Sequence, residues 1–162
     1  AKQIVSKFVL STRTRMNIAR PVVGTPLFVS VFAHAGFEPS FRDDLESLGY
    51  MWIYLARGRL PWQGIRDCAG AAKVARIGQL KAMTPIEELC EGLPVEFAEF
   101  LAYVRSLRQH DKPDYDTIRR MFQALGERLG VEYDGKFDWT NNTYTDQKAS
   151  NSDTADSLPV SK

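Results

Sequence analysis

The 162-residue sequence lacks an excess of charge of either sign, because 21 lysines and arginines face 20 aspartates and glutamates and leave a net charge of +1. This balance does not favour binding to nucleic acid or to a membrane surface. The sequence also lacks an apolar run long enough to span a bilayer. No positively charged start is followed by an apolar segment, so we expect no signal peptide. We therefore expect neither nucleic acid nor a membrane as a partner.

Cysteine is scarce as well, with Cys68 and Cys90 as the only two. Their separation does not match the spacing of metal ligands, so we expect no metal site. Two isolated cysteines are typical of reduced thiols that pack as small apolar side chains in a cytoplasmic or nuclear protein. No stretch repeats at a fixed period, which argues against a solenoid.

The strongest structural signal lies at residues 41–64, which read FRDDLESLGYMWIYLARGRLPWQG. Residues 48–56 carry no charge, and their apolar and aromatic side chains fall on every side of a helix, which predicts a helix buried all round. A short apolar run could also form a buried strand, so the flanking residues decide between the two. They favour a helix, because Ser40 is a good N-cap and Gly58 is a typical helix stop.

Four further helices are expected from apolar residues at helical spacing and from residues typical of helix ends. The first is alanine-rich, although two glycines weaken it by about 1 kcal/mol each. The second opens with TPIE, a capping box with proline at the first helical position. A proline opens the third helix, and an aspartate caps the fourth. Their expected ranges are 67–81, 84–92, 94–108 and 114–130.

The last stretch, residues 140–162, differs from the rest in composition. It is rich in Asn, Ser, Thr and Asp, and it offers little apolar surface to bury. Burial could not offset the entropy lost on ordering such a segment, so we expect a disordered polar tail. The remaining residues are apolar enough to form one globular core.

Several motifs occur in a recognisable order: GT at 24–25, DDLESLGY at 43–50, LPWQG at 60–64 and DKPDY at 111–115. TPIEELCEGLPVEFAEFLAYVRSLR at 84–108 and YDGKFDW at 133–139 belong to the same series. Together they resemble the large lobe of the casein kinase 1 family of Ser/Thr protein kinases. So many matches in one order are a far more specific signal than any single motif.

The resemblance implies a mainly α fold, the helical large lobe (C-lobe) of the protein kinase fold, with the small lobe and the catalytic loop missing. It divides the chain into a partial kinase lobe at 1–139 and the tail at 140–162. Within the lobe, it implies that residues 1–34 form the activation segment and substrate loop, and that 41–139 form the helical core.

The resemblance also implies roles for single residues. Gly24 and Thr25 match the substrate loop, in which the threonine hydroxyl contacts the catalytic aspartate of a kinase. Asp44 resembles the aspartate at a helix N-terminus that supports the backbone of the catalytic loop. His34 occupies a position that looks structural in the family.

The family prefers substrates that are already phosphorylated upstream of the target, and it holds that phosphate with three groups. Two of them are matched here, by the backbone N–H of Gly64 and by Lys73. The third is a loop arginine, and Leu27 stands in its place. The resemblance therefore implies weaker recognition of such primed substrates in this chain.

A protein kinase needs a Gly-rich loop over the phosphates, a strand lysine paired with a helix glutamate, a catalytic aspartate with its asparagine, and a metal-binding Asp-Phe-Gly. None of these occurs in the 162 residues, and Arg42-Asp43-Asp44 matches the catalytic loop only superficially. We therefore expect no catalytic residue, no cofactor and no metal ligand in this chain, and no activity from it alone. Mg-ATP would bind the parent kinase.

Three interpretations follow. The first is a C-terminal fragment of a casein kinase 1-like Ser/Thr kinase, whose partners are protein substrates or the missing N-terminal part. The second is a non-catalytic, pseudokinase-like helical module that binds proteins through the former substrate face. The third, an unrelated helical protein, conflicts with the length and order of the match. In-frame upstream codons for Asp-Phe-Gly and a catalytic loop would establish the first.

Overall fold

The computed structural model describes residues 22–132 and 134–135, and these residues form helices and no strand. This confirms the mainly α fold class. The predicted tail at 140–162 and most of the predicted activation segment, residues 1–21, lie outside the described residues. The division of the chain at residue 139 therefore stays a prediction.

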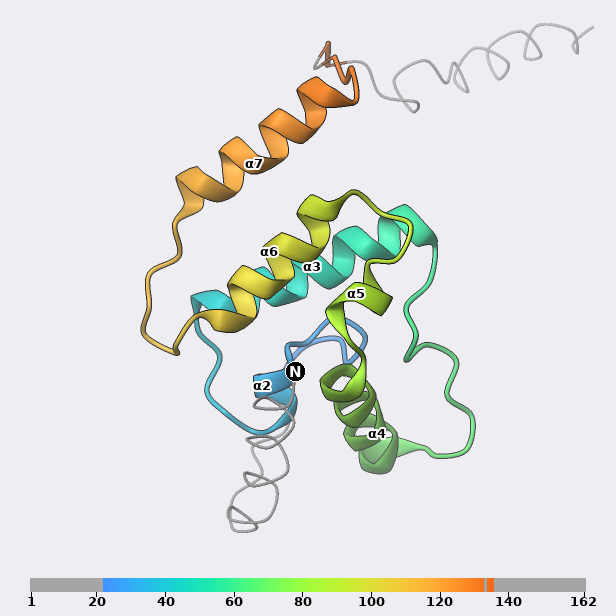
Figure 1. Ribbon diagram of the computed structural model, residues 1–162. Helices are drawn as coiled ribbons and strands as arrows, with labels where there is room; N and C mark the ends of the chain where they lie inside the picture. Colours follow the sequence, from blue (N-terminus) through green and yellow to red (C-terminus); the bar gives the residue numbers. More distant parts are fainter. Residues whose placement is uncertain (1–21, 133, 136–162) are drawn as a thin grey trace, which may run out of the picture.

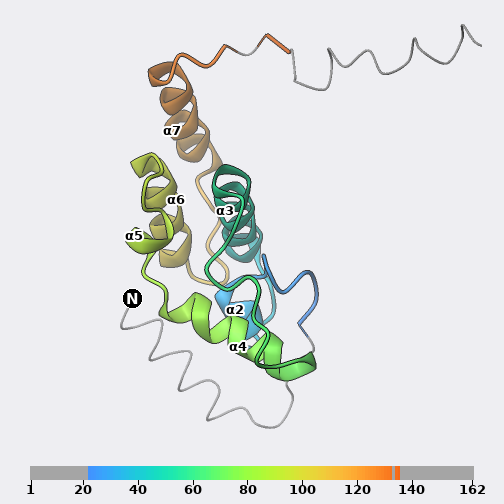
Figure 2. The same ribbon diagram turned by 90° about the vertical axis from the view of Figure 1, so that its right-hand side faces the viewer.

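Two long helices, α3 and α6, pack side by side and form the centre of the molecule (Figures 1 and 2). The short α2 and the longer α4 contact each other on one side of this pair, and α7 contacts α6 on the opposite side. The short α5 packs against α6. The helices span α2 Val31–His34, α3 Phe41–Arg57, α4 Gly70–Met83, α5 Ile86–Leu89, α6 Val95–Ser106 and α7 Tyr115–Arg128.

The predicted ends of α3 are confirmed. At its start, the backbone N–H of Ser40 donates to Asp43 Oδ2 at 2.8 Å, and the Ser40 hydroxyl donates to the same oxygen at 3.0 Å. At its end, Gly58 adopts a left-handed conformation with φ 73°, which glycine accepts without strain. Both ends thus follow from local side-chain chemistry.

The prediction that this helix is buried all round is wrong for the described residues. Tyr50 and Ile53 are 0% and 1% exposed, whereas Leu55 and Met51 are 71% and 39% exposed. Burial of an apolar helix requires neighbours on every side, and α6 and α2 cover only part of α3. An exposed apolar face therefore remains along α3.

Close approach of α3 and α6 depends on a glycine. A methyl group at Gly49 would lie 2.6 Å from Leu101 Cδ2 and 3.1 Å from Phe100 Cε1, closer than packed carbon atoms sit. Both of these α6 side chains are fully buried. The core that forms around this contact also includes Tyr50, Ile53, Leu60, Trp62, Leu89 and Val104.

The later helices occur where they were expected, with changes at their ends. The first begins at Gly70 and not at residue 67. The predicted capping box at Thr84 is wrong, because the Thr84 hydroxyl donates to the carbonyl of Leu80 at 2.8 Å and so ends α4. The caps before α6 and α7 are confirmed: Pro94 precedes α6, and Asp114 accepts the Thr117 N–H at 2.9 Å.

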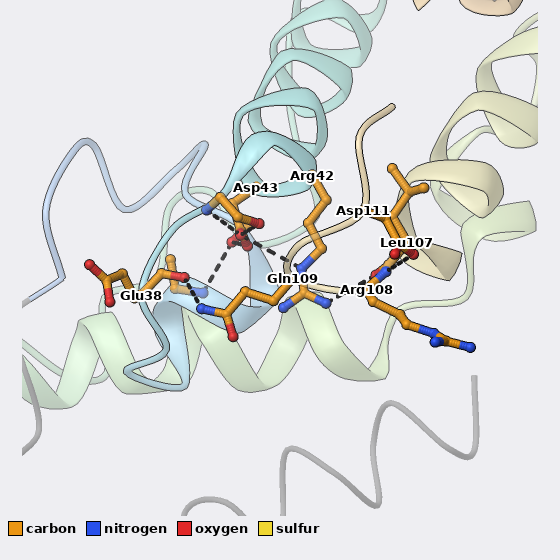
Figure 3. A network of polar contacts seen from close by, with 10 residues as sticks. Glu38, Arg42, Asp43, Leu107, Arg108, Gln109 and Asp111 are labelled. Atoms are coloured by element: carbon orange, nitrogen blue, oxygen red, sulfur yellow. Dashed lines mark hydrogen bonds and ion pairs between the residues drawn. The ribbon is translucent and has the colours of Figure 1, made fainter. Parts of the chain in front are cut away.

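The loop after α6 ties back to the start of α3 (Figure 3). Arg42 donates to the carbonyl of Leu107 at 3.0 Å, and Gln109 donates to the carbonyl of Glu38 at 3.3 Å. These bonds fix the N-terminal end of α3, where the segment from α2 arrives.

Among the described helices, none combines the length and the hydropathy that a membrane span requires.

Candidate functional site

The loop at residues 24–30 lies just before α2 (blue in Figure 1) and forms a tight turn. The backbone N–H groups of Phe28 and Val29 both donate to the carbonyl of Thr25, at 2.9 and 3.2 Å. Gly24, with φ 105°, and Thr25 are exposed. The loop therefore presents its first residues to solvent while its last residues turn into the core.

Side chains from two distant elements hold the carbonyl groups of this loop. Lys81, on α4, donates to Pro26 O at 2.8 Å and to Val29 O at 2.5 Å. The indole N–H of Trp62, in the turn after α3, donates to Leu27 O at 2.8 Å. Three carbonyl groups of the loop are thus held by buried side chains.

His34 makes a further contact, through Nε2 at 3.2 Å from Pro26 O. A carbonyl only accepts hydrogen bonds, so the ring carries its proton on Nε2. Burial, together with the positive charge of Lys81, lowers the pKa of His34 to about 4. The ring is therefore neutral at pH 7, and its structural role stays a prediction.

The end of the loop is joined to α3. Ser30 caps α2 by accepting the Ala33 N–H at 3.0 Å, and its hydroxyl donates to Asp43 Oδ1 at 2.6 Å. Both Ser30 and Asp43 are buried, at 1% and 3% exposure. One carboxylate thus serves both the α3 cap and the loop at residues 24–30. The short helix α2 itself was not anticipated from the sequence.

A polar cluster lies next to Lys81, whose amine is over the ring of Tyr50. Arg105 on α6 donates to Glu46 Oε1 at 3.0 Å and to the Tyr50 hydroxyl at 2.7 Å, and Tyr50 donates to Glu46 at 2.5 Å. Burial raises the pKa of Tyr50 well above its usual value, and nearby Glu46 adds to the effect. Tyr50 is therefore a neutral hydrogen-bonding group, and Glu46 and Arg105 form a buried ion pair.

The residues proposed for phosphate recognition lie near this loop or on α4. Gly64 has φ 78° and is exposed, with open space where a side chain would be. The Trp62–Leu27 bond brings Leu27 against the turn that contains Gly64. Lys73 is partly exposed in the first turns of α4. The roles of Gly64 and Lys73 stay predictions.

Asp44 lies in the first turn of α3 and is exposed, whereas its neighbour Asp43 is buried. Its predicted role beneath a catalytic loop also stays a prediction.

In the described part of the chain, no three His, Cys, Asp or Glu side chains lie close enough to hold a metal ion. Cys68 and Cys90 are free thiols.

Sequence reasoning missed the buried polar residues Lys81, Glu46 and Arg105. A signal was present, because each occupies a helical position four residues from a core residue. Lys81 follows Ile77, Glu46 precedes Tyr50, and Arg105 follows Leu101 by this spacing, which places each pair on one helix face. A charged residue on an apolar face indicates a buried polar contact.

No protein-family model matches the chain. A relative from Schizosaccharomyces pombe, "Casein kinase I homolog 3", is 44% identical to it over 124 residues. The match covers 76% of this chain but 28% of that protein, so the chain spans well under half of the relative's length. The matched part is therefore a C-terminal region of the casein kinase 1 family, and its helices fit the C-lobe of a kinase of that family.

Proposed function

We propose that this chain forms the substrate-binding and scaffolding part of a casein kinase 1-like Ser/Thr kinase, which transfers phosphate from Mg-ATP to proteins. One observation carries the proposal. The loop that holds the exposed Gly24 and Thr25 is fixed through its carbonyl groups by the buried Lys81 and Trp62. A rigid, presented loop is what peptide recognition requires, because a preorganised site loses little entropy on binding.

Phosphoryl transfer would depend on parts that the 162 residues do not include. The chain has no Gly-rich phosphate loop and no Asp-Phe-Gly. Mg-ATP and the catalytic residues would therefore lie in the remainder of a kinase, and protein substrates would bind at the loop. Free, unpaired cysteines agree with a cytoplasmic or nuclear location, which belongs to the same proposal.

A chimera tests the substrate-binding part. Residues 22–132 would replace the corresponding segment of a complete casein kinase 1-family kinase, and casein phosphorylation with radiolabelled ATP would be measured. We expect turnover, with the parent's KM for Mg-ATP retained. A folded chimera that binds Mg-ATP normally but phosphorylates no casein would overturn the proposal.

The 162-residue chain alone tests the catalytic part. We expect no heat of Mg-ATP binding by calorimetry and no casein phosphorylation above a blank. Saturable binding at micromolar ATP, or turnover, would contradict this expectation.

A non-catalytic helical module that binds proteins is the second candidate, and Leu27 at the family's arginine position is the observation that favours it. The same chimera separates the two, because a module that has lost its role in a kinase would leave the chimera folded and inactive on casein.

A further inference from the structure

Lys81 is an unusual residue for the interior of a protein. Its side chain is 0% exposed, whereas lysine is almost never fully buried. The amine lies over the rings of Tyr50 and Trp62, 4.8 and 5.2 Å from their centroids. In the described part of the chain, none of the ion pairs includes Lys81. Its hydrogen bonds go instead to two backbone carbonyls of the substrate loop.

Those two carbonyls receive no hydrogen bond from the loop's own turn. The Phe28 and Val29 N–H groups both donate to Thr25 O, which leaves the oxygen of Val29 to Lys81 and that of Pro26 to Lys81 and His34. Burying a carbonyl without a partner costs free energy, so these bonds favour the observed loop shape. The two bonds join residues 52 and 55 positions away in the sequence.

The amine can serve both carbonyls whether or not it is charged. Burial lowers the pKa of Lys81 to about 7, while Glu46 opposes this change. A neutral lysine amine keeps two N–H groups, which equals the number of carbonyls that it contacts. The attachment of the loop to α4 therefore does not require the positive charge.

We propose that Lys81 is a positioning residue that sets the shape of loop 24–30, and through it the affinity for peptide substrate, without touching the substrate. This inference rests on the proposed function of the loop. The exposed Thr25 lies next to Pro26, whose carbonyl Lys81 holds, so a change in this bond moves the face presented to a peptide. Trp62 holds Leu27 independently, so the loop stays attached to the core when Lys81 is replaced.

The experiment measures steady-state kinetics of the chimera with Lys81→Arg, Lys81→Gln and Lys81→Met. Methionine has a similar length and no donor, glutamine keeps donors on a shorter side chain, and arginine keeps both donors and reach. Lys112→Met is the matched control, because Lys112 is exposed in the loop after α6. Peptide KM, Mg-ATP KM and kcat would be determined for each variant.

We expect Lys81→Met to raise the peptide KM about tenfold, with Mg-ATP KM and kcat within about twofold of the unmodified chimera. Lys81→Gln should fall between methionine and arginine, and Lys112→Met should change nothing. If Lys81→Met does not fold, the peptide KM values of the other two variants test the proposal, and Lys81→Gln should have a higher peptide KM than Lys81→Arg. Hydrogen exchange at the Phe28 and Val29 amides of the chimera should quicken in the order arginine, glutamine, methionine.

The outcomes are distinct. An unmodified chimera without activity would overturn the proposed function. An active chimera whose peptide KM is the same for arginine, glutamine and methionine would overturn the role of Lys81 alone. A fall in kcat with equal rises in the peptide KM and the Mg-ATP KM would also overturn it, because such changes would indicate a general structural role.

Discussion

Single residues in this protein gain their properties from burial as much as from their chemistry. His34 is an ordinary histidine in the sequence, but its environment lowers its pKa to about 4, compared with 6.5 for an exposed histidine. Burial likewise lowers the pKa of Lys81 from 10.5 to about 7. Such groups make stability depend on pH, because the folded and unfolded states bind protons differently.

His34 should make the fold less stable in acid. As the pH falls from 6.5 to 4, the unfolded chain takes up the proton before the folded one, so stability is lost over that range. Allowing for partial exposure, we expect a loss of about 2 kcal/mol. Urea unfolding of the chimera at pH 7 and pH 4 would measure it.

His34→Gln should remove this part of the acid dependence, and His110→Gln, at an exposed position, should not. An identical pH dependence in the His34→Gln variant and the unmodified chimera would show that His34 is not the group responsible.

Leu27 should govern the preference for primed substrates. A charge-assisted hydrogen bond to phosphate contributes about 1.5–3 kcal/mol, which corresponds to roughly ten- to a hundredfold in affinity. We therefore expect the chimera to show little preference for a phosphorylated peptide, and Leu27→Arg to restore it. Relative kcat/KM for matched phosphorylated and unphosphorylated peptides is the measurement.

Val23→Arg adds the same charge at an exposed site four residues away and serves as the control. A strong preference for the phosphorylated peptide in the unmodified chimera would refute the idea, because another group would then replace the missing arginine.

Among the described helices, α3 packs against α6 at the centre of the molecule. Its partner α6 approaches so closely that Gly49 has no space for a methyl group. In an exposed helix, alanine in place of glycine would stabilise by about 1 kcal/mol. At this position the contact with Leu101 and Phe100 should outweigh that gain.

We expect Gly49→Ala to destabilise the chimera by about 1–3 kcal/mol, because overpacking forces side chains and backbone to shift. Ser47→Ala, two residues earlier on a half-exposed part of α3, should have little effect. Denaturant unfolding compares the two variants. Stabilisation by Gly49→Ala would mean that α3 and α6 can separate without cost.

At the scale of the whole molecule, the described helices leave apolar surface uncovered. Phe41, Met51 and Leu55 of α3 are 59%, 39% and 71% exposed. Trp52 lines an apolar cavity of about 510 Å³ with Ile118 and Phe122 of α7. Patches of this kind favour association.

We expect the 162-residue chain alone to aggregate or to pack loosely. Covering several hundred Å² at about 25 cal/mol per Å² would contribute roughly 5–15 kcal/mol, comparable to the stability of a whole domain. Light scattering and a thermal melt test this expectation, and Leu55→Lys should reduce the aggregation. A sharp, cooperative melt from a monodisperse monomer would favour the independent helical module.

The sequence by itself determined the helices from α3 to α7 and several of their ends. Ser40, Gly58, Pro94 and Asp114 act through bonds or dihedral angles within a few residues, so their effects are visible without a fold. The order of motifs likewise indicated the family, which the 44% identity bears out. Short-range chemistry and sequence order are the two kinds of information that a chain carries before it folds.

Only the tertiary structure decided which polar groups are buried and what they hold. Asp43 and Asp44 are equivalent in the sequence, yet only Asp43 points into the contact with Ser30. Thr84 bonds backward to α4 and not forward to α5. Lys81 meets Pro26 from 55 residues away, and such a meeting depends on how α4 packs against the α2 end of the molecule. Burial is a property of neighbours, and neighbours distant in sequence are fixed only by packing.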